Sequence, residues 1–457
     1  MEIKQRLLEA LKGCRADYAD IRFDENIGCG FVFRGEEQDS AKATASTCGT
    51  IRACVKGGWS IISFDNLDNL KELVSRACGN ARLVGKSKTC LAEAPVCTED
   101  FPAVMKNDFR GKSFAEKVAA AAGYNRILLK SAPNITSTIV SYTDTFQRVH
   151  YASTRGACFM EERPHLAFRL FAIACKGDMV QRAFKSIGND EDFGAVENLE
   201  QTCEKVAKQA SDLLNAPQCP GGRTTVILDP DFTGLFTHEA FGHLSEADFL
   251  YENPQMQKLM HIGRRMGPDF LNIIDDGTLP GHMGTRHVDD EGTPTRRNML
   301  IQNGVLAGHL HSLETAGKMG EQATGNARGL NGAFPPIVRM TNTFIAPGKL
   351  SPDQLFEGVD DGIYCCGGLA GQTMMEMFTF TATHGYRIRN GKACELLRDV
   401  MVTGNVFETL QNIDGIANDF RMENTGGGCG KGGQSPLPVG TGGPHIRIRN
   451  AVVAGQE

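Results

Sequence analysis

The sequence lacks any block of lysine and arginine residues. Its 48 basic and 54 acidic residues leave a net charge of −6 over 457 residues. A surface that follows a phosphate backbone needs clustered basic residues, so direct binding to nucleic acid is excluded. Long apolar runs are also missing: a stretch such as 167–174 is far shorter than the roughly 20 residues that cross a bilayer, and it contains Arg169. A membrane-spanning protein is therefore not expected.

Neither a signal peptide nor a disulfide framework is expected. Residues 1–14 place Ile3, Leu7, Leu8 and Leu11 on one helical face with charged residues between them, which predicts a structural helix rather than a continuous apolar core. The 15 cysteines are odd in number and irregularly spaced, which indicates reduced thiols. We therefore expect a cytoplasmic protein.

The chain is too long for one ordinary hydrophobic core, because single cores stop growing at roughly 250–300 residues. A composition of 41% hydrophobic and 22% charged residues is that of a globular protein, and no internal repeat is visible. The turn-rich segment 216–222 predicts a boundary, with an α+β domain over 1–220 and a sheet-rich, mainly antiparallel domain over 221–457. In the first domain we expect strands at 30–34, 49–55, 59–64 and 165–174, a strand pair at 137–143 and 148–153, and helices at 65–77, 113–129 and 196–215.

The strongest chemical signal is the pattern His238-Glu239-x-x-x-His243, inside a helix predicted over 231–250. In the HExxH pattern of zinc peptidases, two histidines one helical turn apart bind the metal and the glutamate polarises the bound water. Here the spacing is one residue longer, and five residues turn an α-helix by roughly 140°, so the two rings would diverge. A π-type turn, helped by the flexibility of Gly242, would bring them together.

Two histidines leave a catalytic zinc site incomplete, because such sites use three protein ligands and one open position. The glycine-rich segment 426–443 contains Cys429 between glycines, where the backbone can approach a metal closely. Cys429 is our candidate for the third ligand of one zinc ion per chain. Each residue taken alone is better explained as an ordinary helix or turn residue, so the combination carries the argument.

Several segments of the second half resemble the TldD/PmbA family, also known as modulators of DNA gyrase, and specifically its TldD-type zinc metallopeptidases. The first half is similar to that family only in length and in the order of its elements. The segments that carry the resemblance are HEAFGHLSEADF (238–249), 275–309, GNARG (325–329), RMTNTFIAPG (339–348) and GGGCGKGGQSPLPVG (426–440).

The resemblance implies that His238, His243 and Cys429 bind the metal and that Glu239 is the catalytic glutamate. Ser245 and Ala247 depart from the Leu and Gly that the family usually carries at these positions. The family further implies cleavage of unfolded or leader-type peptides in an enclosed cavity, and a homodimer or a heterodimer with a PmbA/TldE-like paralogue. The PmbA branch lacks the metal motif, so this chain is similar to the active branch.

Two other functions are compatible with the same residues. Cys429 could act as the nucleophile of a cysteine peptidase, with His445 or His238 as its base. Alternatively, the chain could be a catalytically silent binding or regulatory subunit, although a structural zinc site has no use for Glu239.

Polar residues of the family-like segments give further candidates. Asn326, Arg328, Arg339 and Asn342 could bind substrate or stabilise an oxyanion, but a structural role is the better interpretation of all four. The acidic runs 275–276 and 289–291 could bind a second cation, but neighbouring glycine and proline favour solvated turns.

Overall fold

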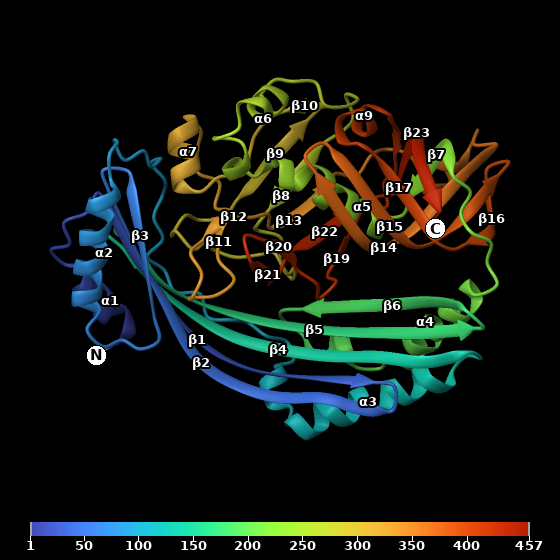
Figure 1. The fold of residues 1–457 in the computed structure, drawn as a ribbon, viewed down its shortest axis with the longest axis horizontal. Helices are drawn as coiled ribbons and strands as arrows, with labels where there is room; N and C mark the ends of the chain where they lie inside the picture. The colour runs from blue at the N-terminus through green and yellow to red at the C-terminus, as the bar shows by residue number, and fades with distance from the viewer. Residues whose placement is uncertain (1, 456–457) are drawn as a thin grey trace.

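Long antiparallel strands from the first 190 residues form one strongly curved sheet in the computed structural model, which describes residues 2–455 (Figure 1). The strands lie in the order β3-β2-β1-β4-β5-β6. Several of the expected short strands are parts of these longer ones. The bounds are β1 (Tyr18–Arg34), β2 (Glu37–Val55), β3 (Gly58–Phe64), β4 (Ile135–Ser153), β5 (Cys158–Lys176) and β6 (Met179–Asn189).

The strand pair predicted at 137–143 and 148–153 is wrong, because β4 runs without interruption through the polar residues between them. Asp144, which suggested a turn, is buried in the sheet. It accepts hydrogen bonds from Lys117 Nζ at 2.5 Å and from the Tyr142 hydroxyl at 2.6 Å. The paired charge lets a carboxylate remain inside a strand.

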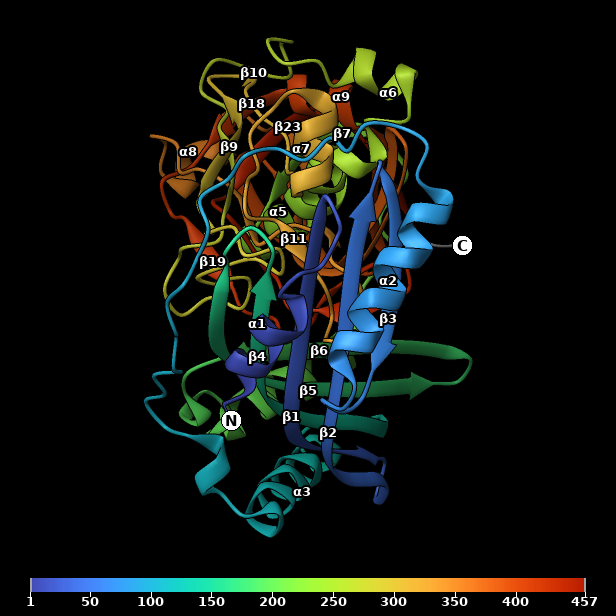
Figure 2. The same cartoon turned by 90° about the vertical axis from the view of Figure 1, so that its left-hand side faces the viewer.

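Helices cover the two ends of this sheet, as Figures 1 and 2 show. At one end, α1 (Ile3–Leu11) and α2 (Leu70–Val84) bury their apolar faces, and at the other end α3 (Phe114–Lys130) and α4 (Glu200–Leu213) do so. Helix α2 begins five residues later than predicted because Asn69 adopts the left-handed conformation, with φ 55°. The predicted start of α3 is confirmed by a capping box between Ser113 and Glu116.

The second half contains two larger sheets with α5 (Pro230–Phe236) between them, in contact with strands of both. One sheet follows the order β10-β9-β8-β13-β22-β19. It comprises β8 (Ile273–Asp276), β9 (Arg297–Gln302), β10 (Val305–Leu306), β13 (Asn342–Ile345), β19 (Arg421–Glu423) and β22 (Gly440–Gly443). The other follows β14-β7-β23-β17-β15-β16, and it closes on itself because β14 also pairs with β15. It comprises β7 (Gly222–Leu228), β14 (Asp361–Met374), β15 (Met377–Arg389), β16 (Lys392–Leu397), β17 (Val400–Asn405) and β23 (Ile446–Gly455), with β18 (Ile413–Ile416) on β23.

Short elements complete this half. They are β11 (Ala327–Arg328), β12 (Ile337–Val338), β20 (Cys429–Lys431) and β21 (Gln434–Leu437), with α6 (Pro254–Leu259), α7 (Leu313–Met319), α8 (Pro352–Phe356) and α9 (Val406–Gln411). Most strand pairs are antiparallel, and β13–β22 and β14–β7 are parallel. The predicted class, α+β with a mainly antiparallel second half, is confirmed. We keep 1–220 and 221–457 as the proposed domain division.

The acidic runs are not solvated turns, so that prediction is wrong. Asp290 is buried between the two halves, where it pairs with Arg163 at 2.8 Å and with Arg22 at 2.7 Å. Glu291 pairs with Arg52 at 3.0 Å. These arginines come from strands of the first sheet more than 120 residues earlier in the chain. Their ion pairs join the two halves and so fix the walls of any site between them.

Within residues 2–455, no helix combines the length and the apolar character needed to cross a membrane. All 15 cysteines are free thiols, as predicted.

Candidate metal centre

The helix that carries the His-Glu-His pattern changes its pitch at that pattern. Helix α5 begins after Asp229, whose side chain accepts a hydrogen bond from the Phe232 amide. From Thr237 to Gly242 the chain forms a π-helix (η3), followed by two short 3-10 turns. The predicted π-type turn is confirmed, whereas a single helix over 231–250 is wrong. The wider turn brings the rings of His238 and His243 within 5.1 Å, centroid to centroid.

Gly242 serves this turn by allowing close packing rather than by flexibility. Its φ of −56° is ordinary helical backbone. A Cβ at this position would lie 2.0 Å from the sulfur of Met340, a side chain that is itself fully buried. The glycine therefore lets the π-helix sit directly against the core.

Gly242→Ala is expected to lower the free energy of unfolding by about 1–3 kcal/mol, because the added methyl overpacks the contact with Met340. Urea unfolding of the metal-free protein measures this change. Gly79→Ala in α2 is the matched control, since its Cβ would meet open space, and it should be neutral or stabilising by up to about 1 kcal/mol. Equal stability of the Gly242 variant and wild type would contradict the packing argument.

Cys429 reaches this helix from β20, almost 190 residues later in the chain. Its sulfur lies 3.3 Å from His243 Nε2, and one donor atom each from His238, His243 and Cys429 lie within 4.8 Å of one another. Strand β21 holds β20 in place, and a Cβ at Gly428 would lie 2.8 Å from the Leu437 carbonyl oxygen. The structure thus brings together all three residues that the sequence proposed as ligands.

A buried carboxylate behind His243 is a feature that sequence reasoning missed. His243 Nδ1 donates to Glu246 Oε2 at 2.9 Å, and Lys431 Nζ donates to the same oxygen at 3.0 Å and to Asp248 at 2.6 Å. Glu246 is fully buried. Metal-binding histidines commonly direct their second nitrogen to a carboxylate in this way. The spacing offered a signal, since Glu246 follows His243 by three residues and Lys431 follows Cys429 by two.

Glu239 faces the open side of the cluster. Its side chain is 25% exposed, and its Oε2 lies 3.8 Å from His243 Nε2. His238 and Ala240 on either side of it are buried. Glu239 borders a cavity of about 540 Å³ that also reaches His238 and Cys429. The wall opposite contains Phe171 and Phe184 of the first sheet, so both halves of the chain enclose this space.

The proposed ligands His243 and Cys429 shift each other's pKa values. Burial disfavours the Cys429 thiolate, but the charges and hydrogen bonds of His238 and His243 lower the pKa of the thiol to about 5. Burial likewise disfavours the His243 imidazolium, but hydrogen bonds to Cys429 and Glu246 raise its pKa to about 11. Without a metal, the pair is therefore a thiolate and an imidazolium across the neutral range.

This donor set fits zinc. A thiolate and two imidazoles are ligands that zinc prefers, and one position would remain open beside Glu239. His238 Nδ1 is buried and has no hydrogen-bond partner among residues 2–455. An unpaired buried nitrogen is costly, and a bound metal is one partner that would satisfy it.

Metal removal is expected to make Cys429 reactive toward a small alkylating agent such as iodoacetamide from about pH 6 upward, since its pKa is about 5. The alkylation rate of Cys429 should stay nearly constant between pH 6 and 8. The alkylation rate of an ordinary thiol, with a pKa of roughly 8.5, rises about tenfold per pH unit over the same range. Peptide mass mapping measures the modification, with exposed Cys90 and Cys394 as references. Zinc should protect Cys429, and a tenfold rise per pH unit at Cys429 would contradict the thiolate assignment.

The four polar residues considered for substrate binding are all buried and serve the structure. Asn326 donates to Asp275 at 2.8 Å, and Asn342 donates to the Asp276 carbonyl at 2.7 Å. Arg328 donates to the Met340 and Pro438 carbonyls, and Arg339 donates to the Cys429 carbonyl at 2.6 Å. Arg339 therefore acts on the site indirectly, because it holds the backbone of the proposed ligand.

His445 is not brought to Cys429. Its Nδ1 donates to Asp419 at 2.7 Å, and its Nε2 accepts from the Tyr364 hydroxyl at 2.9 Å. Both ring nitrogens are occupied, so His445 cannot serve as the base of a cysteine nucleophile. Of the two bases considered for that alternative, His238 remains.

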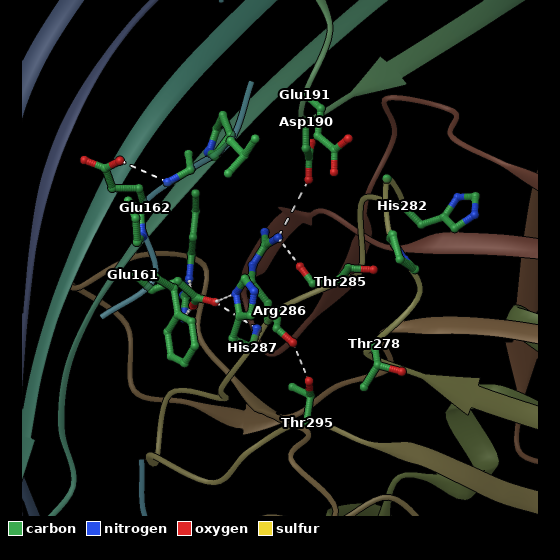
Figure 3. A pocket seen from close by; sticks show the side chains of 18 residues that line it. Glu161, Glu162, Asp190, Glu191, Thr278, His282, Thr285, Arg286, His287 and Thr295 are labelled. Carbon is green, nitrogen blue, oxygen red and sulfur yellow. Dashed lines mark hydrogen bonds and ion pairs between the residues drawn. The ribbon is translucent and has the colours of Figure 1, made fainter. Parts of the chain in front are cut away.

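A second cavity of about 490 Å³ lies at the junction of the two halves (Figure 3). Two ion pairs lie within its lining, Arg163 with Glu161 and Arg286 with Asp190. The His287 amide donates to Glu161 at 2.8 Å, and Arg286 Nη1 lies 3.7 Å from Asp190. These contacts, together with the stacking of Phe101 on His287, connect the halves. We assign no chemistry to this cavity.

Residues 221–455 match the PmbA/TldA metallopeptidase C-terminal domain, and residues 107–214 match the PmbA/TldA metallopeptidase central domain. A metalloprotease of Synechocystis sp. is 42% identical over 96% of this chain and 95% of its own. A zinc metalloprotease TldD homolog of Saccharolobus solfataricus is 32% identical over 71% of this chain and 72% of its own. The crystal structure of TldE from Thermococcus kodakarensis shares the fold, with a TM-score of 0.75 at 18% identity, over 99% of this chain and 100% of that one.

Proposed function

This chain belongs to the TldD/PmbA family of metallopeptidases, and we propose that it is a zinc-dependent peptidase of the TldD type that cleaves unfolded or leader-type peptides. In this proposal His238, His243 and Cys429 hold one zinc ion at the active site, and Glu239 is the catalytic residue. The observation that carries the proposal is the convergence of two imidazoles, one thiol and one partly exposed carboxylate on a single cavity.

A bound zinc ion would supply a Lewis acid that polarises the scissile carbonyl and lowers the pKa of an attacking water. The chain supplies the proton transfers and the geometry. Glu239 accepts the proton of the water and passes it to the leaving amine, a role that suits a carboxylate facing the cavity. Glu246 and Lys431 keep His243 oriented, and Arg339 holds the backbone of Cys429.

A strand edge beside the cavity supports binding of a peptide in extended conformation. The floor of the cavity includes the glycine-rich part of β14, where a Cβ at Gly371 would lie 3.1 Å from Glu239 Cγ. In the described part of the chain, β14 pairs with β7 only up to Cys365, so the edge beyond it faces the cavity side without a strand partner. A peptide added along that edge would be held through its backbone, with little selectivity for side chains.

The two alternatives differ from this proposal in what the metal does. A silent regulatory subunit would not need Glu239 poised at an open metal position. A cysteine peptidase would use the Cys429 thiolate with His238 as base, and metal would inhibit it rather than activate it.

The direct test is hydrolysis of a reduced and alkylated reference protein, with the same protein in its folded form as control. The zinc-loaded chain should cleave only the unfolded form, chelation should abolish cleavage, and added Zn²⁺ should restore it; mass spectrometry of new N-termini measures all three. Activity that survives chelation would contradict the zinc mechanism and favour the cysteine nucleophile.

A partner chain belongs to the same proposal. We propose a homodimer or a heterodimer with a PmbA/TldE-like paralogue, and the fold that this chain shares with TldE supports the second assembly. Light scattering of the purified chain with and without such a paralogue distinguishes these assemblies.

A further inference from the structure

A second group of potential metal ligands lies outside the proposed active site. His309 and His311 are in the connection between β10 and α7, and Glu321 follows α7. One donor atom from each of the three lies within 4.8 Å of the others. Both histidines are almost completely buried, with 3% and 1% exposure. Two buried imidazoles directed at one carboxylate need a physical explanation.

The remaining nitrogen of each imidazole is held by an oxygen. His309 Nε2 donates to the Met260 carbonyl at 2.7 Å, and His311 Nδ1 lies 3.1 Å from the Thr315 hydroxyl. These contacts leave His309 Nδ1 and His311 Nε2 facing Glu321, at 3.0 and 3.1 Å. Imidazoles that bind metals show this arrangement, with one nitrogen on the metal and the other donating to a carbonyl or hydroxyl oxygen.

Hydrogen bonding alone explains the group poorly. The Met260 carbonyl and the Glu321 carboxylate are both acceptors, and a neutral imidazole has only one N–H, so a neutral His309 cannot donate to both. The His311 ring, 6.0 Å away, faces the same carboxylate. A divalent cation at the centre would let both imidazoles be neutral, each with a single N–H on its outer oxygen.

We propose that His309, His311 and Glu321 bind a second divalent transition-metal ion of the zinc, cobalt or iron(II) class. Two imidazoles and a carboxylate suit these ions, whereas Mg²⁺ and Ca²⁺ prefer oxygen ligands only. The group borders a cleft of about 500 Å³, which leaves space for water as additional ligands. Two arginines line the same cleft, but Arg296 donates to Asn298 and Gln322, and Arg297 lies 3.9 Å from Asp276.

The role of this ion is structural support of the active-site loop. Leu310, between the two histidines, accepts a hydrogen bond from the Ala247 amide at 3.0 Å and donates to the Ser245 carbonyl at 2.8 Å. Glu246 lies between these two residues and holds His243. An ion on His309 and His311 thus stiffens the backbone that positions Glu246.

Metal stoichiometry tests this site independently of peptidase activity. Metal-free chains are dialysed against excess Zn²⁺ or Co²⁺, and bound metal is counted by mass spectrometry. We expect two ions in wild type, one in Glu321→Gln and one in Cys429→Ser. With Co²⁺, Glu321→Gln should keep the thiolate-to-cobalt charge-transfer band, whereas Cys429→Ser should lose the band and keep one ion. Glu314→Gln is the matched control on α7, because Glu314 pairs with Lys318 at 2.9 Å instead, and it should bind two.

One ion in wild type, accounted for entirely by the thiolate band, would overturn the second site, as would two ions in Glu321→Gln. If Glu321→Gln does not fold, titration of wild type with Co²⁺ tests the site by itself. A second equivalent of bound Co²⁺ that does not increase the thiolate-to-cobalt band supports the second site. If cobalt-loaded wild type shows no thiolate-to-cobalt band, Cys429 is not a ligand and the proposed active site is wrong. The number of ions lost in Glu321→Gln would still test the site at His309, His311 and Glu321.

Discussion

Glu239→Gln is expected to lower peptide hydrolysis by about 10²- to 10⁴-fold while the zinc content stays at the wild-type level. The amide has nearly the shape of the carboxylate but cannot accept the proton of the attacking water. Because Glu239 is 25% exposed at the cavity and is not one of the three converging donors, its replacement should leave the metal centre intact. Hydrolysis of an unfolded reference protein and metal content are measured on the same sample.

Asp231→Asn is the control for a general effect of removing a negative charge from the cavity. Asp231 lines the same space but has no place in the proposed chemistry, and burial raises its pKa to about 6. This variant should keep activity within a few-fold of wild type. Full activity in Glu239→Gln would remove the glutamate from the mechanism, and loss of zinc from it would make Glu239 a ligand.

Cys429→Ala and His243→Ala are each expected to lose the active-site zinc ion and to reduce hydrolysis to the level of the metal-free protein. Removing one of three ligands leaves two donors, too few for the three that a catalytic zinc site uses. In the alanine variant of Cys429, the His243 imidazolium also loses the thiolate 3.3 Å away, so the site becomes more positive and less able to hold a cation. Mass spectrometry of bound metal and the hydrolysis assay measure both effects.

Cys203→Ala is the matched control, because Cys203 is an equally buried free thiol in α4 of the first half. It should keep the same zinc content and activity as wild type. Unchanged zinc in Cys429→Ala would refute the third-ligand assignment, whereas a metal-free but active wild type would favour Cys429 as a nucleophile.

Local patterns predicted the elements that depend on neighbours along the chain. The N-terminal helix, α3 with its capping box, and the π-type turn at Thr237–Gly242 all follow from spacing and side-chain type over a few residues. The prediction of a turn within β4 was wrong because Asp144 is neutralised by Lys117, which comes from another element. The acidic runs were misread for the same reason, since Asp290 and Glu291 find arginines far away in the sequence.

The sequence by itself determined the chemistry that this protein can perform: the order of two histidines and a glutamate on one helix, a cysteine in a glycine-rich segment, and the resemblance to one peptidase family. Tertiary structure alone decided the rest. It placed Cys429 beside His243, buried Glu246 behind it with Lys431, and gathered His309, His311 and Glu321 around one point. The physical reason is that periodicity and propensity act over a few residues, whereas burial, charge pairing and the convergence of ligands depend on segments that only the folded chain brings together.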